Sequence, residues 1–155
     1  MRTRTILLTV AALFAAAVVC FAAEDVNMGT WKLNEGKSKL AAGATKNNTV
    51  VYEAAGDSVK VTIDGVNGTG QATHNEWTGK FDGKDYAVTG DPTSDMRSYK
   101  RVNSHTMTFV IKKGGKVTAT GRIAVSADGK SRTVTLSGTD AMGMKVTGTA
   151  VYDKQ

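Results

Sequence analysis

Apolar and polar residues alternate along most of the chain after residue 28. In the stretch 58–64 every second residue is apolar, and the stretches 107–111, 123–125 and 134–136 repeat this pattern. A period of two is typical of a β-strand with one face buried and the other in water. The pattern predicts an all-β protein with about nine or ten strands between residues 28 and 154.

Glycine-containing turns separate the alternating stretches. They fall at residues 55–57, 82–83, 114–115 and 128–129, and the last three are Asp-Gly, Gly-Gly and Asp-Gly pairs. These residue types favour the tight turns of β-hairpins, because glycine adopts positive φ at little cost. Consecutive strands are therefore expected to be antiparallel neighbours in an up-and-down meander.

The turns also predict how the strands pair. A turn at residues 128–129 places Ile123 opposite Val134 and Gly121 opposite Leu136, so that apolar residues share one face of the sheet. Such agreement matters because a slip of one residue would send the whole apolar set to the other face.

The hairpin around residues 114–115 predicts a longer loop. A two-residue turn would place Ile111 opposite Thr118, whereas a three-residue loop over residues 113–115 places Ile111 opposite Val117. We therefore expect a bulged three-residue loop at this hairpin.

Many short antiparallel strands must hide their edges, and closure into a barrel does so most economically. The fold expected is one domain over residues 24–155, most simply an up-and-down β-barrel. A two-sheet sandwich is the alternative that the alternation leaves open. Only residues 34–45 lack the alternation, and their lysines, alanines and Leu40 predict one short helix after the first strand.

The first predicted strand begins Gly29-Thr30-Trp31-Lys32-Leu33, and the last ends with residues 151–154, Val-Tyr-Asp-Lys. The first stretch resembles the Gly-x-Trp opening of lipocalins and fatty-acid-binding proteins, and the second resembles the last strand of the latter. The resemblance implies a calycin-like barrel, nearest to small exported bacterial lipocalin-like proteins of unassigned activity. It implies that Trp31 plugs one barrel end, and we expect residues 34–45 to cover it. Tyr152 matches a ligand-binding tyrosine of fatty-acid-binding proteins, but Ala150 replaces their arginine.

The N-terminal residues have a different character. Arg2 and Arg4 precede an apolar run over residues 6–19, and Cys20-Phe21-Ala22 follows. This is the anatomy of a secretory signal peptide, predicted here over residues 1–23. The only cysteine, Cys20, would leave with it, or would be the lipidated residue if the protein were a lipoprotein. A chain without disulfides that is exported suits a bacterial periplasm or secretion from a bacterium.

The chain carries a formal charge of +6, which becomes +4 once Arg2 and Arg4 are removed with the signal peptide. A basic protein is attracted to anionic lipid, glycan or nucleic acid. Export argues against nucleic acid. An envelope interaction domain that contacts anionic lipid or glycan, with no internal ligand, is therefore the alternative function.

The residues that catalysis needs are scarce. The chain has two histidines, His74 and His105, which fall short of a zinc or copper ligand set. No serine stands in a nucleophile-elbow context, and the glycines lie in β-turns rather than in a phosphate-binding loop. We expect no enzyme activity, no metal and no cofactor.

The leading hypothesis is a monomeric barrel that binds or carries a small apolar molecule. Ligand pockets combine an apolar wall with a few polar groups. The residues predicted to contact the ligand are Trp77, Tyr86, Arg97, Tyr99 and Tyr152. Room for a cavity is predicted from small inward-facing residues, namely Gly79, Ala119, Gly121, Gly148 and Ala150.

Overall fold

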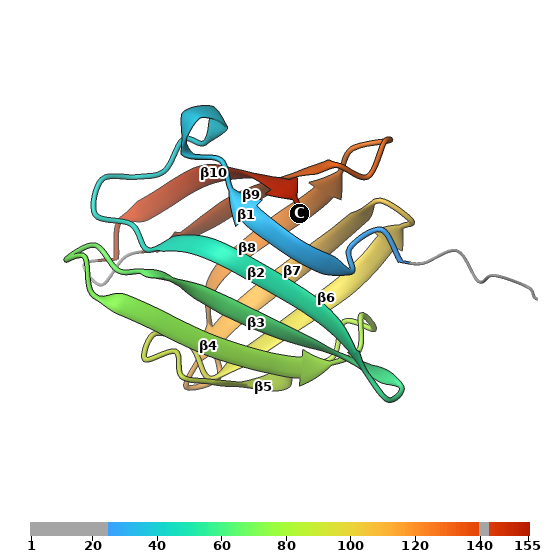
Figure 1. The fold of residues 1–155 in the computed structure, drawn as a ribbon. Helices are drawn as coiled ribbons and strands as arrows, with labels where there is room; N and C mark the ends of the chain where they lie inside the picture. The colour runs from blue at the N-terminus through green and yellow to red at the C-terminus, as the bar shows by residue number, and fades with distance from the viewer. Residues whose placement is uncertain (1–24, 140–142) are drawn as a thin grey trace, which may run out of the picture.

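The computed structural model describes residues 25–139 and 143–155, and these form one antiparallel β-barrel (Figure 1). The predicted signal peptide, residues 1–23, lies outside the described residues. The strands are β1 Gly29–Leu33, β2 Lys46–Ala55, β3 Ser58–Val66, β4 Ala72–Gly79, β5 Tyr86–Thr89, β6 Met96–Asn103, β7 Thr106–Lys113, β8 Lys116–Val125, β9 Ser131–Thr139 and β10 Lys145–Lys154.

Each strand pairs with the strand before it, and β1 closes the sheet by pairing with both β2 and β10. Trp31 stands opposite Val50 on one side and Lys154 on the other, so the sheet has no free edge at its first strand. The predicted closed up-and-down meander is confirmed, and the sandwich alternative is excluded.

The predicted register of the β8–β9 hairpin is confirmed, with Ile123 opposite Val134 and Gly121 opposite Leu136. The predicted three-residue loop between β7 and β8 is wrong. Lys113 pairs with Lys116 across a two-residue turn, and the register shifts inside the strands, so that Ile111 faces Ala119. An extra residue within β8 therefore keeps the apolar residues on one face, which the longer loop was expected to do.

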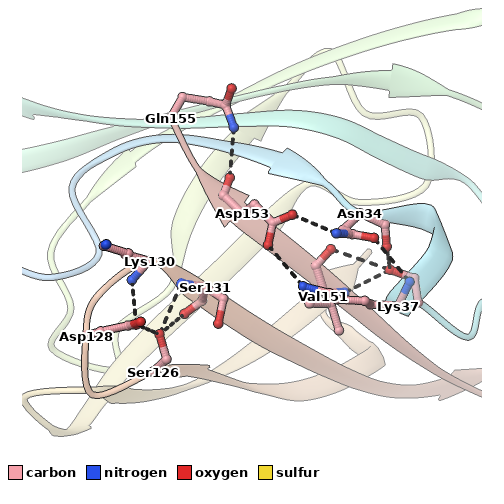
Figure 2. A network of polar contacts seen from close by, with 10 residues as sticks. Asn34, Lys37, Ser126, Asp128, Lys130, Ser131, Val151, Asp153 and Gln155 are labelled. Atoms are coloured by element: carbon pink, nitrogen blue, oxygen red, sulfur yellow. Dashed lines mark hydrogen bonds and ion pairs between the residues drawn. The ribbon is translucent and has the colours of Figure 1, made fainter.

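The helix expected between residues 34 and 45 is a single 3-10 turn, η1 (Glu35–Lys37). Asn34 caps it by accepting a hydrogen bond from the backbone N–H of Lys37. Asn34 also donates to the Asp153 carboxylate over 2.7 Å, which ties the turn to β10 (Figure 2). The segment that follows, residues 38–45, is not helical and returns to the start of β2.

The two ends of the barrel differ. We call the end where β1 begins and β10 finishes the closed end, and the end where β1 finishes and β10 begins the hollow end. Trp31 lies near the closed end with no exposed surface, and its indole N–H donates to the Asn27 carbonyl over 2.9 Å. The expectation that residues 34–45 cover Trp31 is wrong, because residues 25–28 cover it and residues 34–45 lie at the hollow end.

The buried apolar core runs along the inside of the barrel. Its side chains come from nine of the ten strands in the alternation that the sequence predicts. The core residues are Trp31, Val50, Tyr52, Val61, Ile63, Trp77, Val88, Tyr99, Met107, Phe109, Ile123, Val125 and Tyr152.

Candidate ligand-binding site

A pocket of about 320 Å³ lies at the hollow end, between the inner faces of β9 and β10 and the segment 38–45. Its walls are mainly apolar, and Thr45 and Asn47 contribute polar groups. A volume near ~300 Å³ is at the lower end of the range for small-molecule sites. The apolar side chains that line it are Leu33, Leu40, Ala41, Ala42, Ala44, Val134, Leu136, Val146, Ala150 and Tyr152.

The small residues on the inner face explain where the space remains. A Cβ added at Gly121 would lie 2.2 Å from the Phe109 ring, and one added at Gly79 would lie 2.5 Å from the Tyr86 ring. These glycines therefore make room for aromatic rings, and the barrel is filled beside them. A Cβ at Gly148 would meet nothing nearer than 3.6 Å. The space predicted from small residues thus remains at Gly148 and Ala150, which line the pocket.

The segment 38–45 is held over the pocket by backbone contacts. Lys39 pairs with Thr149 of β10 through two hydrogen bonds of 2.7 and 2.8 Å. The Ser38 hydroxyl accepts from the Val151 N–H over 2.9 Å and donates to the Asn34 carbonyl over 2.7 Å (Figure 2 shows the labelled partners). These hydrogen bonds attach residues 38 and 39, the first residues of the covering segment, directly to β10.

The other side of this cover touches the β3–β4 loop. A Cβ added at Gly68 would lie 2.1 Å from the Gly43 carbonyl oxygen, so only glycine allows the two backbones to approach so closely. Asn67 organises the loop by accepting hydrogen bonds from the backbone N–H groups of Thr69 and Gln71. The cover is therefore supported from β10 and from this loop.

Tyr152 lines the pocket and contacts a buried cation on its other side. Arg132 of β9 stands opposite Tyr152 and is 2% exposed. Its guanidinium carbon lies 4.9 Å from the Trp31 ring centre, 5.0 Å from that of Tyr52 and 4.8 Å from that of Tyr152. Such cation–π contacts favour a desolvated guanidinium by up to about 2 kcal/mol each.

The cation is not fully hydrogen-bonded. Among the described residues, Nε and Nη1 of Arg132 have no hydrogen-bond acceptor. Burial raises the pKa of the Tyr152 hydroxyl, and the positive charge of Arg132 opposes part of this rise. Burial likewise raises the pKa of Tyr52 well above its ordinary value, against the same opposing charge. Both tyrosines therefore stay neutral beside Arg132 at physiological pH.

Of the five residues predicted to contact a ligand, Tyr152 lines the pocket. Trp77, Tyr86 and Tyr99 lie together on β4, β5 and β6, outside the lining of that pocket. Trp77 is 1% exposed, and its ring centre lies 4.8 Å from that of Tyr99 and 5.7 Å from that of Tyr86, both edge to face. Both tyrosine rings pack against Trp77, and contact between these three residues and a ligand stays a prediction.

Arg97, the fifth predicted residue, is 5% exposed and is held by the loop between β5 and β6. Its Nη2 lies 3.6 Å from the Asp91 carboxylate and donates to Asn75 over 3.4 Å. Burial acts to raise the pKa of Asp91, but hydrogen bonds from Ser94 and Thr93 and the charge of Arg97 outweigh it and lower that pKa. Arg97 thus pairs with a carboxylate of its own chain.

Sequence reasoning missed Arg132, although a signal was present. Residue 132 has the same parity as Val134 and Leu136, which the alternation places inside, so period two puts Arg132 inside as well. Leu33 and Leu40 were also missed as pocket residues. Leu33 lies two residues after Trp31 on β1, and the position of Leu40 depends on how the irregular segment folds back over β10.

Among the described residues, no group of three His, Cys, Asp or Glu side chains is placed to hold a metal ion. No helix in the described ranges is long and apolar enough to cross a membrane.

No protein-family model matches the chain. No curated protein sequence matches it either. Among solved structures, that of EF1p2_mFAP2b bound to DFHBI is similar, with a TM-score of 0.46 and 9% sequence identity. The match covers 84% of this chain and 94% of that chain, and the likeness concerns the fold alone.

Proposed function

We propose that the protein binds or carries a small apolar molecule at the hollow end of the barrel and does not catalyse a reaction. The observation that carries this proposal is the pocket of about 320 Å³ beneath the segment 38–45, with its mainly aliphatic lining. Apolar surface that leaves water for such a lining gains ~25 cal/mol per Å². Thr45, Asn47 and the Tyr152 hydroxyl are candidates to orient a ligand through one or two hydrogen bonds.

The proposal is tested with the probe N-phenyl-1-naphthylamine, whose fluorescence rises in an apolar site. We expect saturable binding of micromolar order. The variant Ala150→Leu places a larger side chain in the pocket and should abolish the rise. The matched control is Val151→Leu, which enlarges the neighbouring residue on the outer face of β10 and should leave binding unchanged.

Each of the alternative results has a definite meaning. If the parent protein gives no saturable signal, the interior does not take an apolar ligand and the proposal fails. If Ala150→Leu and Val151→Leu both retain parental binding while their melting temperatures match the parent, the probe binds elsewhere and the proposal fails as well.

Export is part of the same proposal and rests on residues 1–23 of the sequence. Protein recovered from a bacterial periplasm should begin near residue 24 by N-terminal sequencing. Retention of Met1, or a lipid attached to Cys20, would replace this part of the proposal.

A further inference from the structure

A trough of about 750 Å³ crosses the outside of the barrel over β7, β8, β9 and β10. It lies between two rows of outward-facing side chains that the strand register places side by side. One row is Thr149, Thr135, Arg122 and Thr108, and the other is Thr147, Ser137, Thr120 and Val110. Six of these eight side chains carry a hydroxyl group.

The backbone forms the floor of the trough. The residues between the two rows, Gly148, Leu136, Gly121 and Phe109, face the interior or have no side chain. Residues two apart on a strand are separated by about 6.8 Å, and neighbouring strands by about 4.8 Å. The trough therefore runs across four strands, with one row of side chains along each side.

The charges at the trough are positive. Lys39 and Arg122 line it, and none of the described lining residues is Asp or Glu. The outer face of β3 and β4 is different, because there Lys60 pairs with Glu76 over 2.8 Å and His74 with Asp64 over 2.6 Å. Neither Lys39 nor Arg122 has such an ion pair within the described ranges, so both charges are available to an external anion.

We propose that this trough binds a linear oligosaccharide that carries carboxylate groups. Threonine and serine hydroxyls both donate and accept hydrogen bonds, as sugar hydroxyls do, and a guanidinium binds carboxylate through two parallel hydrogen bonds. A site for single-stranded nucleic acid needs exposed aromatic rings on which the bases stack. The one ring among the described lining residues, Phe109, is buried in the core. The trough lies on the outer face of the barrel, and it shares Leu136, Thr147 and Gly148 with the lining of the interior pocket.

The test titrates isotope-labelled protein with a hexamer of galacturonic acid and follows the backbone amide signals. Saturable shifts are expected at Thr120, Thr135, Ser137 and Thr147. The methyl-esterified hexamer, which keeps the sugar chain but lacks the charges, should bind at least about tenfold more weakly. Added salt should also weaken binding, because exposed charges are screened.

Three variants separate the trough from general attraction to a basic protein. Arg122→Gln should weaken binding at least about tenfold, since it removes a charge-assisted contact. Thr135→Val, which has nearly the same shape without the hydroxyl, should weaken it by a few-fold. Lys84→Gln removes the same charge from the loop between β4 and β5 and should change the affinity less than about twofold.

The proposal is overturned if Lys84→Gln weakens binding as much as Arg122→Gln, because net charge would then explain the attraction. It is also overturned if Thr135→Val binds like the parent, or if the shifted amides lie away from β7–β10. Binding to vesicles of phosphatidylglycerol with no binding of the hexamer would assign the surface to a membrane instead. Thermal melting of every variant confirms that it is folded.

Discussion

The two ends of this barrel are built from the same strands but are filled differently. Toward the closed end, Arg132 on β9 packs against the Trp31 and Tyr52 rings and against Tyr152 on β10, which also lines the pocket. At the hollow end, the same strands carry Gly148 and other small or aliphatic residues, and a pocket remains. The sizes of the inward-facing residues on β9 and β10 therefore decide which end of the barrel is filled by side chains and which end keeps a pocket.

The segments that cover the two ends of the barrel also differ in how tightly they fill the space beneath them. Residues 25–28 close one end through a side chain, because the buried Trp31 indole donates to the Asn27 carbonyl and Arg101 pairs with Asp25. Residues 38–45 close the other through backbone pairing of Lys39 with Thr149 and place only small and aliphatic side chains over the pocket. The first arrangement is a packed lid, and the second leaves room beneath it.

The largest effect expected is that of Trp31→Ala at the closed end. It removes a fully buried ring, which is also one of the aromatic rings that contact the Arg132 guanidinium. The free energy of unfolding should therefore fall by ~3 to 5 kcal/mol. Leu33→Ala is the matched change at the hollow end, two residues further along β1. It should cost about 2 kcal/mol or less, because this half-buried side chain faces a pocket. Urea denaturation measures both, and equal losses would show that the two ends are equally packed.

Arg132 gives the next largest effect. Arg132→Ala should lower the free energy of unfolding by about 2 kcal/mol, because it removes the contacts with three rings and leaves a cavity. Arg132→Met keeps most of the volume without a desolvated charge and should stay within about 1 kcal/mol of the parent. Both variants should raise the pKa of Tyr152 further, since the charge that opposes the rise is gone. Phenolate absorbance against pH measures this, and an unchanged titration would contradict the contact.

A pair of glycine substitutions compares filled and hollow regions directly. In Gly121→Ala the new Cβ would lie 2.2 Å from Phe109 and 2.3 Å from the Thr135 carbonyl oxygen, so the variant should lose ~1 to 3 kcal/mol. In Gly148→Ala the nearest atom is 3.6 Å away, and the protein should gain ~0.4 to 1 kcal/mol. Thermal unfolding of both variants tests the signs. A loss at Gly148 as large as that at Gly121 would mean that the hollow end is already filled.

The smallest effect concerns the charge that fastens the closed end. Burial acts to raise the pKa of Asp25, but hydrogen bonds from Arg101 and Asn27 outweigh it and lower that pKa below 3.8. Because the folded value lies below the unfolded one, Asp25 stabilises the protein above pH 3.8, and this contribution is lost as the pH falls through the folded value.

Asp25→Asn should therefore lower the free energy of unfolding at pH 7 by about 1 kcal/mol or less, and the difference from the parent should shrink as the pH falls through the folded pKa of Asp25. Glu53→Gln, at an exposed carboxylate on β2, is the control and should show a smaller difference at pH 7. A difference for Asp25→Asn that persists unchanged at low pH would show that the charge of Asp25 is not involved.

The sequence by itself determined the all-β class, the meander and much of the register. Alternation and Asp-Gly turns act between neighbours in the chain, so they can be read locally, and the pairing of Ile123 with Val134 follows from one turn. The inward position of Arg132 could also have been read from the same parity. The β7–β8 hairpin was misjudged because an extra residue can be accommodated in the turn or in the strand with the same inward pattern.

Only the tertiary structure decided that the sheet closes, which segment covers which end, and where space remains. Closure depends on contacts between β1 and β10, more than a hundred residues apart in sequence. Gly79, Gly121 and Gly148 are alike in the sequence, yet two of them lie under aromatic rings and one lines a pocket. Whether a small residue leaves a cavity depends on the side chain that faces it from a distant strand, and local alternation carries no information about that neighbour.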